Sequence, residues 1–383
     1  MNRLLFTLPI LAIASASFAQ EPHPWAMRGA DPQRTGRSPV AASDSGIVEW
    51  KYRLPSSVPG IAVSRSGLIC TGSVFNGSWW SGETYLSVLE SSGDVRFRRK
   101  VVPYEWGASQ GTNSSPGWNA AEEIITGSTN GQVIKLSKDG ALIWTYQRRQ
   151  DASNDFSIAI LPDGSIRGNQ FGTFGLSASG QLLFDTSNGY STPAVSELLE
   201  MATGGTRSSS GHTNRPAVVF MNPDGSIKWI HSILRGGGSQ PLFDGPNTVI
   251  AGVGTGQTIA FDRSGSIKWT AGGGMSALYA LGRNRQLYVG GGNSITALNA
   301  DTGELIWSAS VPGPVVDFLS VDSRERVYAT TSNGYVVSLG PSGSTLLSQK
   351  VCDKFNTGPA VGTGGSVLAS GMIGFDHFLF KIR

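Results

Sequence analysis

The sequence predicts an all-β fold, an eight-bladed β-propeller made of four-stranded antiparallel blades. The first observation is a glycine followed four residues later by a large apolar residue, a pair that recurs eight times. The second is the spacing, because successive glycines lie 38 to 47 residues apart, and such a period with four strands per unit is typical of propeller blades. The third is composition, since 51 glycines and 15% charged residues suit many short strands and tight turns.

The clearest copy of the repeat runs from Gln286 to Ser308. Apolar and polar residues alternate in short runs on either side of a Gly-containing turn, which is the pattern of antiparallel hairpins. Gly303 suits a turn position with positive φ, and Trp307 opens the outermost strand. The eight pairs are Gly46/Trp50, Gly93/Phe97, Gly140/Trp144, Gly180/Phe184, Gly225/Trp229, Gly265/Trp269, Gly303/Trp307 and Gly343/Leu347.

The repeated aromatic residues are expected to be structural. A large ring at the start of each outermost strand would fill the gap between neighbouring blades. The residues with this expected role are Trp50, Phe97, Trp144, Phe184, Trp229, Trp269 and Trp307.

The N-terminal segment is predicted to be processed and then to lead into the propeller. Residues 1–19 combine Arg3, an apolar run and a small-x-small site at Ala19, which together predict a cleaved secretory signal peptide. The apolar run is short for a membrane span, so we expect a chain that does not span a membrane and that acts in the periplasm or outside the cell. Residues 20–45 hold four prolines and no strand pattern, which predicts an extended arm packed on the body.

Residues 46–383 are predicted to form a single propeller domain. Residues 46–54 match only the last strand of a repeat, and residues 356–383 match the first three strands and then stop. The two partial copies should therefore combine into one composite eighth blade. Such closure would remove the open sheet edges that otherwise invite aggregation.

Composition and spacing exclude several classes of function. A net charge of +3 gives no strong basic field, so no nucleic-acid partner is expected. We also expect the protein to be a monomer. The four histidines are scattered without metal-ligand spacing, no G-x-S-x-G nucleophile motif is present, and no catalytic or metal-binding residue is predicted. Cys70 and Cys352 occupy different points of the repeat, and whether they form a disulfide stays open.

Irregular insertions fall on one face of the predicted ring. They are residues 72–84, 102–114 and 203–216, in second-to-third-strand and blade-to-blade connections. Loops on a rigid scaffold commonly carry binding sites, and exposed aromatic rings suit recognition of a partner. Alternatively, these rings pack onto the glycine-rich loops as local plugs. The candidate binding residues are Trp79, Trp80, Tyr104, Trp106, Arg207, His212 and Arg215.

The repeat resembles the pyrroloquinoline-quinone (PQQ) enzyme repeat. The resemblance rests on residues 287–307 (LYVGGGNSITALNADTGELIW) and 124–144 (IITGSTNGQVIKLSKDGALIW), and on an arm-like segment at residues 25–38 (WAMRGADPQRTGRS). That family includes quinoprotein alcohol dehydrogenases and the non-enzymatic propeller of the outer-membrane protein assembly machinery. The resemblance implies eight blades. It assigns no calcium ligand or catalytic Asp, because no two cysteines are adjacent here and no large insertions enclose a cofactor chamber.

The sequence therefore predicts a non-catalytic scaffold that binds a protein or peptide partner and holds no cofactor. One alternative, which the resemblance implies, is a PQQ-dependent oxidoreductase that lacks the usual markers. Another is a carbohydrate-binding propeller that uses the tryptophan-rich rim.

Overall fold

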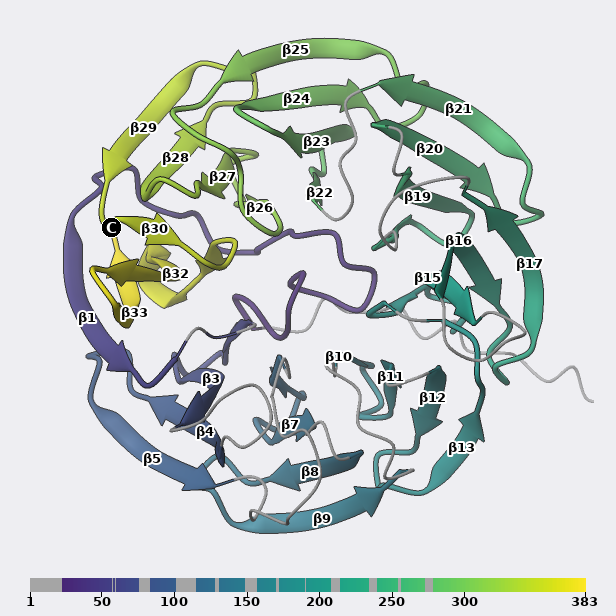
Figure 1. The fold of residues 1–383 in the computed structure, drawn as a ribbon, viewed down its shortest axis with the longest axis horizontal. Helices are drawn as coiled ribbons and strands as arrows, with labels where there is room; N and C mark the ends of the chain where they lie inside the picture. Colours follow the sequence, from purple (N-terminus) through teal and green to yellow (C-terminus); the bar gives the residue numbers. More distant parts are fainter. Residues whose placement is uncertain are drawn as a thin grey trace, which may run out of the picture.

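Eight antiparallel sheets stand around a central axis in the structure, a computed structural model (Figure 1). The structure describes residues 23–56, 58, 60–75, 83–100, 115–127, 131–148, 157–169, 172–189, 191–207, 214–233, 240–253, 256–272 and 278–383. The predicted signal peptide lies outside the described residues. The predicted fold class, an eight-bladed all-β propeller, is confirmed.

Seven blades are continuous in sequence, and each is a four-stranded sheet whose strands follow chain order from the axis outward. Blade 1 consists of β2 (Ile61–Val63), β3 (Ile69–Phe75), β4 (Glu83–Leu89) and β5 (Val95–Lys100), and blade 2 of β6 (Gly117–Trp118), β7 (Ile124–Gly127), β8 (Gln132–Leu136) and β9 (Leu142–Gln147). Blade 3 consists of β10 (Ser157–Ile160), β11 (Ile166–Asn169), β12 (Thr173–Leu176) and β13 (Leu182–Asp185), and blade 4 of β14 (Ala194–Val195), β15 (Met201–Arg207), β16 (Asn214–Met221) and β17 (Ile227–Ser232).

The next three blades follow the same plan. Blade 5 consists of β18 (Leu242–Asp244), β19 (Thr248–Val253), β20 (Gln257–Asp262) and β21 (Ile267–Gly272). Blade 6 consists of β22 (Tyr279–Leu281), β23 (Gln286–Gly291), β24 (Ser294–Asn299) and β25 (Leu305–Ser310). Blade 7 consists of β26 (Ser320–Val321), β27 (Val327–Thr330), β28 (Tyr335–Leu339) and β29 (Thr345–Lys350).

The eighth blade joins the two ends of the chain and closes the ring. Its strands are β1 (Val48–Leu54), β30 (Lys354–Phe355), β31 (Ala360–Val361), β32 (Val367–Ile373) and β33 (Asp376–Ile382), with the 3-10 turn η1 (Thr363–Gly365) before β32. The N-terminal β1 pairs antiparallel with β33 and is the outermost strand. Glu49 of β1 also forms ion pairs with Lys381 at 3.0 Å and with Arg383 at 2.6 Å. Closure by the terminal strands therefore agrees with the composite blade expected from the two partial repeats.

Burial changes from the axis to the rim, and the sequence pattern follows it. Second and third strands such as β7 and β12 are buried at every residue, because a neighbouring blade covers each of their faces. Outermost strands such as β9 and β25 alternate between exposed and half-buried residues. Clusters of buried side chains therefore run from one blade to the next; one of them joins Leu86 of blade 1 to Trp118 and Ile134 of blade 2.

Each repeated aromatic ring packs on the repeated glycine of the following blade. Gly303 of blade 6, at φ +74°, lies so close to Trp269 of blade 5 that an added Cβ would be 2.6 Å from the ring. The five repeated tryptophans, each the third residue of its outermost strand, also donate a hydrogen bond from Nε1 to a turn carbonyl of the next blade. These bonds run from Trp50 to Ser91, Trp144 to Ala178, Trp229 to Arg263, Trp269 to Ala300 and Trp307 to Pro341, at 2.8–3.2 Å.

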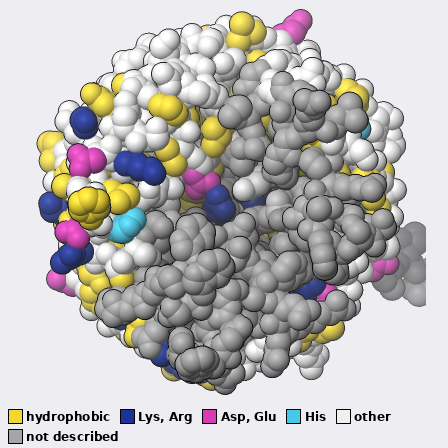
Figure 2. Space-filling view, viewed as in Figure 1, with side chains coloured by type: hydrophobic (Ala, Val, Ile, Leu, Met, Phe, Trp, Pro, Cys, Tyr) yellow, Lys and Arg dark blue, Asp and Glu magenta, His cyan; other side chains and the backbone are white. Residues whose placement is uncertain are grey.

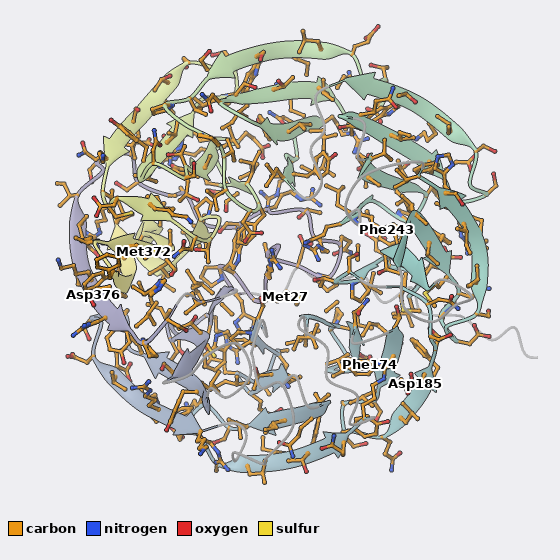
Figure 3. All side chains as sticks on the ribbon, viewed as in Figure 1. Met27, Phe174, Asp185, Phe243, Met372 and Asp376 are labelled. Carbon is orange, nitrogen blue, oxygen red and sulfur yellow. The ribbon has the colours of Figure 1, made fainter. Side chains whose placement is uncertain are left out.

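Residues 23–45 run through the centre of the ring, where Met27 lies (Figure 3). In six blades one backbone amide of the inner strand donates to a carbonyl of the arm at 2.7–3.0 Å. The six bonds run from Val63 to Trp25, Trp118 to Ala26, Val195 to Pro32, Phe243 to Gln33, Leu281 to Thr35 and Val321 to Gly36.

The remaining two blades also contact the arm. In blade 3 the amide of Ile160 donates to the sulfur of Met27 at 3.4 Å, and in blade 8 the carbonyl of Gly365 accepts from Ser43 at 2.8 Å. The arm thus makes one circuit of the axis and meets the blades in chain order. Because buried backbone amides need partners, the arm completes the inner edge of the propeller.

Candidate functional site

The ring has two faces that differ in their connections. Second-to-third-strand turns and blade-to-blade segments lie on one face, called here the loop face. First-to-second-strand and third-to-fourth-strand turns lie on the other, the turn face. The described strands on either side of the predicted insertions, such as β3 and β4 or β15 and β16, meet these insertions at the loop face.

Most of the candidate binding residues lie outside the described residues. These are Trp79, Trp80, Tyr104, Trp106 and His212. Arg207 and Arg215 lie at the loop-face ends of β15 and β16, where Arg207 pairs with Asn214 and Arg215 with Thr206. The structure therefore places these two arginines on neighbouring strands and leaves the proposed aromatic rim as a prediction.

An exposed aromatic residue on the loop face was missed by the sequence reasoning. Phe375 lies between β32 and β33, and 98% of its surface is exposed. Near it, Asp376 forms an ion pair with Arg53 at 2.6 Å, and burial lowers the pKa of His377. Hydrophobic, charged and histidine side chains gather over this last blade in Figure 2. The sequence signal was a Gly-Phe pair at the tip of a hairpin.

A second group of polar residues lies in the central channel. It comprises Arg28, Asp31, Arg34 and Arg37 of the arm together with Asp317 of the segment before β26, and is called here the channel cluster. Arg28 forms an ion pair with Asp317, a residue held at φ 58°. Asp31 accepts hydrogen bonds from the backbone amide and the hydroxyl of Thr35.

Arg34 is the most enclosed charge of the channel cluster, with 8% of its surface exposed. It donates to the carbonyl of Thr192 at 3.2 Å and to the side-chain oxygen of Gln240. Thr192 lies two residues before β14 and Gln240 two residues before β18, so the Arg34 guanidinium lies toward the loop face. Burial and the nearby charge of Arg28 lower the pKa of Arg34 to about 9, although Asp317 and Asp31 act in the opposite direction.

Burial also raises the pKa of Asp31, against the opposing effects of Arg37 and of the hydrogen bonds from Thr35. The channel cluster therefore holds three guanidinium groups and two carboxyl groups in a partly dehydrated place. The sequence reasoning missed it because a proline-rich arm carries no repeat or spacing motif. The available signal was three arginines within ten residues of an arm that should be packed on the body.

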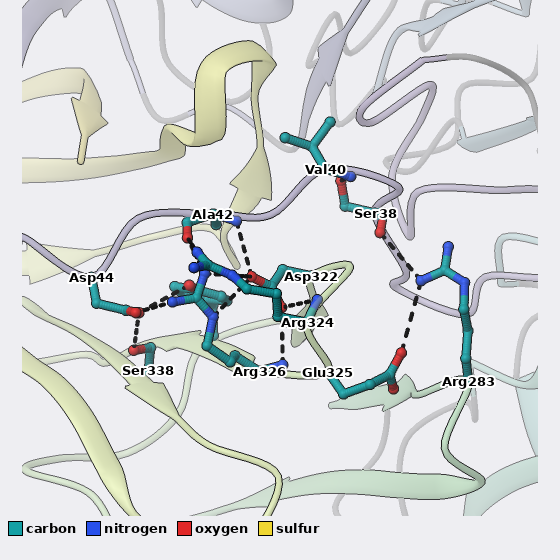
Figure 4. A network of polar contacts seen from close by, with 11 residues as sticks. Ser38, Val40, Ala42, Asp44, Arg283, Asp322, Arg324, Glu325, Arg326 and Ser338 are labelled. Atoms are coloured by element: carbon teal, nitrogen blue, oxygen red, sulfur yellow. Dashed lines mark hydrogen bonds and ion pairs between the residues drawn. The ribbon is translucent and has the colours of Figure 1, made fainter.

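The end of the arm is fixed by a polar network on blade 7 (Figure 4). Arg326 forms ion pairs with Asp322, at 2.6 Å, and with Asp44 of the arm. Asp322 also accepts from the backbone amide of Ala42 at 2.9 Å, and Asp44 accepts from Ser338 at 2.7 Å. Every buried charge in this network is paired within the protein, which indicates a structural role.

The described residues contain no group of three or more His, Cys, Asp or Glu side chains able to hold a metal ion. Cys70 and Cys352 are both buried and unpaired, and burial raises the pKa of each thiol. Within the described part of the chain, no helix has the length and apolar character needed to cross a membrane.

Comparison with known proteins agrees with this architecture. Residues 214–372 match the family model described as outer membrane protein assembly factor BamB. A comparison with curated proteins gives no match.

Solved structures similar to this chain include both dehydrogenases and BamB. A europium-containing methanol dehydrogenase aligns with TM-score 0.70 and 10% identity over 94% of this chain and 91% of its own. A quinohemoprotein alcohol dehydrogenase from Comamonas testosteroni aligns with TM-score 0.70 and 12% identity over 96% and 81% of the two chains. BamB from Moraxella catarrhalis aligns with TM-score 0.61 and 16% identity over 89% and 98%. The chain is thus an eight-bladed propeller similar in fold to both BamB and the quinoprotein dehydrogenases, and its residues 214–372 match a family model of PQQ-like repeats.

Proposed function

We propose that this protein is a non-catalytic scaffold that binds a protein partner on its loop face, outside the cytoplasm. The observation that carries the proposal is the path of the arm, which occupies the axis of the ring and hydrogen-bonds to the inner strands of six blades. Because the arm lies along the axis, the surface on which the repeats differ most is the rim of the loop face. There the described residues include the fully exposed ring of Phe375, and the insertions carry Trp79, Trp80 and Trp106.

The channel does not fit a quinone bound with a metal ion. Its two carboxyl groups, Asp31 and Asp317, are engaged by Thr35 and Arg28, and the buried side chains of Trp25 and Met27 lie beside them on the arm. These contacts support a structural rather than a cofactor-binding use of the channel. The match to the BamB family model supports a partner of the protein class.

The binding experiment compares loop-face variants with a variant of the outer wall. The mature protein would be cross-linked in its own cell envelope, and its partner identified by mass spectrometry. We expect Phe375→Ser, and separately the triple change of Trp79, Trp80 and Trp106 to Ala, to lower partner yield at least tenfold with little change in melting temperature. Leu305→Ser removes an exposed apolar side chain (66% exposed) from β25 and should leave the yield unchanged. Equal loss in all three variants would reject the loop face as the binding surface.

A second candidate function is PQQ-dependent oxidation, which the fold shared with two dehydrogenases favours. Purified protein would be incubated with PQQ and calcium, and quinone absorbance and reduction of an electron-accepting dye would be followed with several alcohols. The scaffold proposal expects neither signal. Saturable binding of PQQ together with turnover of an alcohol would show that the protein is an oxidoreductase and would contradict the scaffold proposal.

The proposed location has a direct test. Secretion predicts that the mature protein begins at Gln20, which N-terminal sequencing of the native protein can establish. A native chain that retains residues 1–19 and fractionates with the cytoplasm would contradict the location.

A further inference from the structure

We propose that the channel cluster binds one carboxylate group of an acidic ligand at the loop-face end of the central channel. This site differs from the exposed rim in both residues and chemistry. The proposal does not depend on which partner the rim binds, because a free organic acid and an acidic peptide offer the same group.

The first argument is charge. The channel cluster has three arginines against two aspartates, an excess of one positive charge when all are ionised. Arg34 is the least exposed of the three, and among the described residues its hydrogen bonds go to neutral oxygens, those of Thr192 and Gln240, while Asp31 and Asp317 act on it only through their charge. Burying a charge without an ionic partner is costly. One bound anion would balance the cluster.

The second argument is unused donors. The Nε atoms of Arg28 and Arg37 are buried, and neither has an acceptor among the described residues. Arginine presents its N–H groups in a planar fork that matches a carboxylate in two parallel hydrogen bonds. Two such donors, together with the guanidinium of Arg34, supply directional bonds as well as charge.

The third argument selects a single carboxylate over a more highly charged anion. Asp31 and Asp317 already bring negative charge into the cluster, and both influence Arg34. A group with two negative charges would overcompensate the excess and meet repulsion from these aspartates. A carboxylate with one negative charge matches the imbalance.

The fourth argument is access. The side chains of Arg28 and Asp317 are 18% and 13% exposed, so the ion pair is reached from outside. Basic and acidic side chains are visible together in the hollow at the centre of the face drawn in Figure 2. A ligand that extends from the loop face could place a carboxylate there.

The experiment measures binding of three probes to the full mature protein by calorimetry. The probes are acetate, succinate and a hexaglutamate peptide, with hexaglutamine as the neutral control. We expect saturable binding of at least one carboxylate probe and none of hexaglutamine. Preference for the peptide would identify an acidic protein segment as the source, whereas preference for succinate would identify a small organic acid.

Two variants test the cluster in opposite directions. Arg28→Gln removes one donor fork and should weaken binding about tenfold. Asp317→Asn should strengthen it about tenfold, because it frees Arg28 and removes a competing charge. Asn tolerates the positive φ at this position. Arg53→Gln removes the same charge from the rim of the same face, where Arg53 is paired with Asp376, and should leave affinity unchanged.

The outcomes separate cleanly. Absence of saturable carboxylate binding to the wild-type protein would overturn the proposal. So would equal weakening by Arg28→Gln and Arg53→Gln, which would indicate general surface attraction. If Arg28→Gln fails to fold, the direction of change in Asp317→Asn still decides. Loss of rim binding in the Phe375→Ser variant has no bearing on this result, so the two proposals can fail independently.

Discussion

The contact between a tryptophan and the glycine of the next blade is the smallest unit from which this ring is built. Trp269 shows both parts of it: its ring lies against Gly303, and its Nε1 donates to the carbonyl of Ala300 at 3.0 Å. Phe97 and Phe184 keep the ring and lack the N–H group. The glycine is required twice, because positive φ disfavours a side chain and because the ring occupies the space of a Cβ.

Replacing the glycine separates these two requirements. Gly303→Ala should destabilise the protein by about 3 kcal/mol, since the left-handed backbone costs about 1–2 kcal/mol and the new methyl group overlaps the ring of Trp269. Gly256→Ala is the matched control, because Gly256 has φ +79° and no described residue comes within 4 Å of the added Cβ. Urea unfolding of both variants checks this, and equal losses would show that the ring contact is unimportant.

Removing only the N–H group isolates the hydrogen bond. Trp269→Phe should cost about 1 kcal/mol, the usual net worth of one such bond. Trp25→Phe should cost less, because the buried Nε1 of Trp25 has no acceptor among the described residues while its ring stacks on Phe318 at 5.5 Å. The midpoints of denaturant unfolding give the loss of unfolding free energy for each variant, provided that its dependence on denaturant concentration is unchanged. A larger loss for Trp25→Phe than for Trp269→Phe would contradict this account.

The arm is the element that links the blades at the axis. An inner strand is the edge of its sheet, and an edge amide without a partner is unfavourable when buried. The arm supplies carbonyl acceptors to amides at the same register in six blades. It therefore stabilises the blades together, in addition to the side-chain contacts between neighbours.

Deleting residues 20–37 should expose this row of amides. Hydrogen exchange at Val63, Trp118, Val195, Phe243, Leu281 and Val321 should become at least tenfold faster than in the full mature protein. Amides of the β24–β25 pair, such as Ala297 and Trp307, lie away from the arm and should keep most of their protection. Uniform acceleration at both sets would indicate global destabilisation in place of a local role at the axis.

The difference between repeat and arm explains what could be predicted from the sequence. The blade count and the closure were predictable because every copy repeats the Gly303-to-Trp307 spacing, and because two partial copies complement each other. The circuit of the arm was not, since its partners are backbone amides, which carry no side-chain signature. Arg34 gives no sequence motif either, because its partners Thr192 and Gln240 belong to two separate blades and lie far from it in the sequence. Phe375 was missed because a single ring at a hairpin tip breaks no pattern.

Across the complete ring, ion pairs between blades make stability sensitive to acid. The side chain of Glu200 in blade 4 is 2% exposed and accepts from Lys228 of its own blade and from Arg263 of blade 5, at 2.9 and 2.6 Å. Burial alone would raise the pKa of Glu200, but hydrogen bonds from Arg263 and Lys228 outweigh burial and lower it from 4.5. The pKa of Glu123 is lowered in the same way: its hydrogen bonds with Lys135 and Asn119 outweigh burial.

The sign of the pH effect follows from these lowered values. A carboxyl with a lower pKa in the folded state binds fewer protons than in the unfolded state, so its stabilisation is complete above about pH 4.5 and is lost as pH falls through the folded pKa. Glu200→Gln should therefore destabilise by about 2 kcal/mol at pH 7 and by much less at pH 3. Glu90→Gln, at an exposed pair with Arg96, should change little at either pH. Urea titrations at both pH values test the difference.

The arm also fixes an orientation. His23, where the described chain begins, accepts a hydrogen bond from the backbone amide of Arg65 and lies 2.9 Å from the carbonyl of Asn119, both in first-to-second-strand turns. An affinity tag or a surface linker joined directly to His23 would therefore start on the turn face. A protein immobilised through its N-terminus would present the opposite side, with Phe375 and the mouth of the channel, to the solution. Immobilisation by this end is thus the favourable geometry for measuring what the loop face captures.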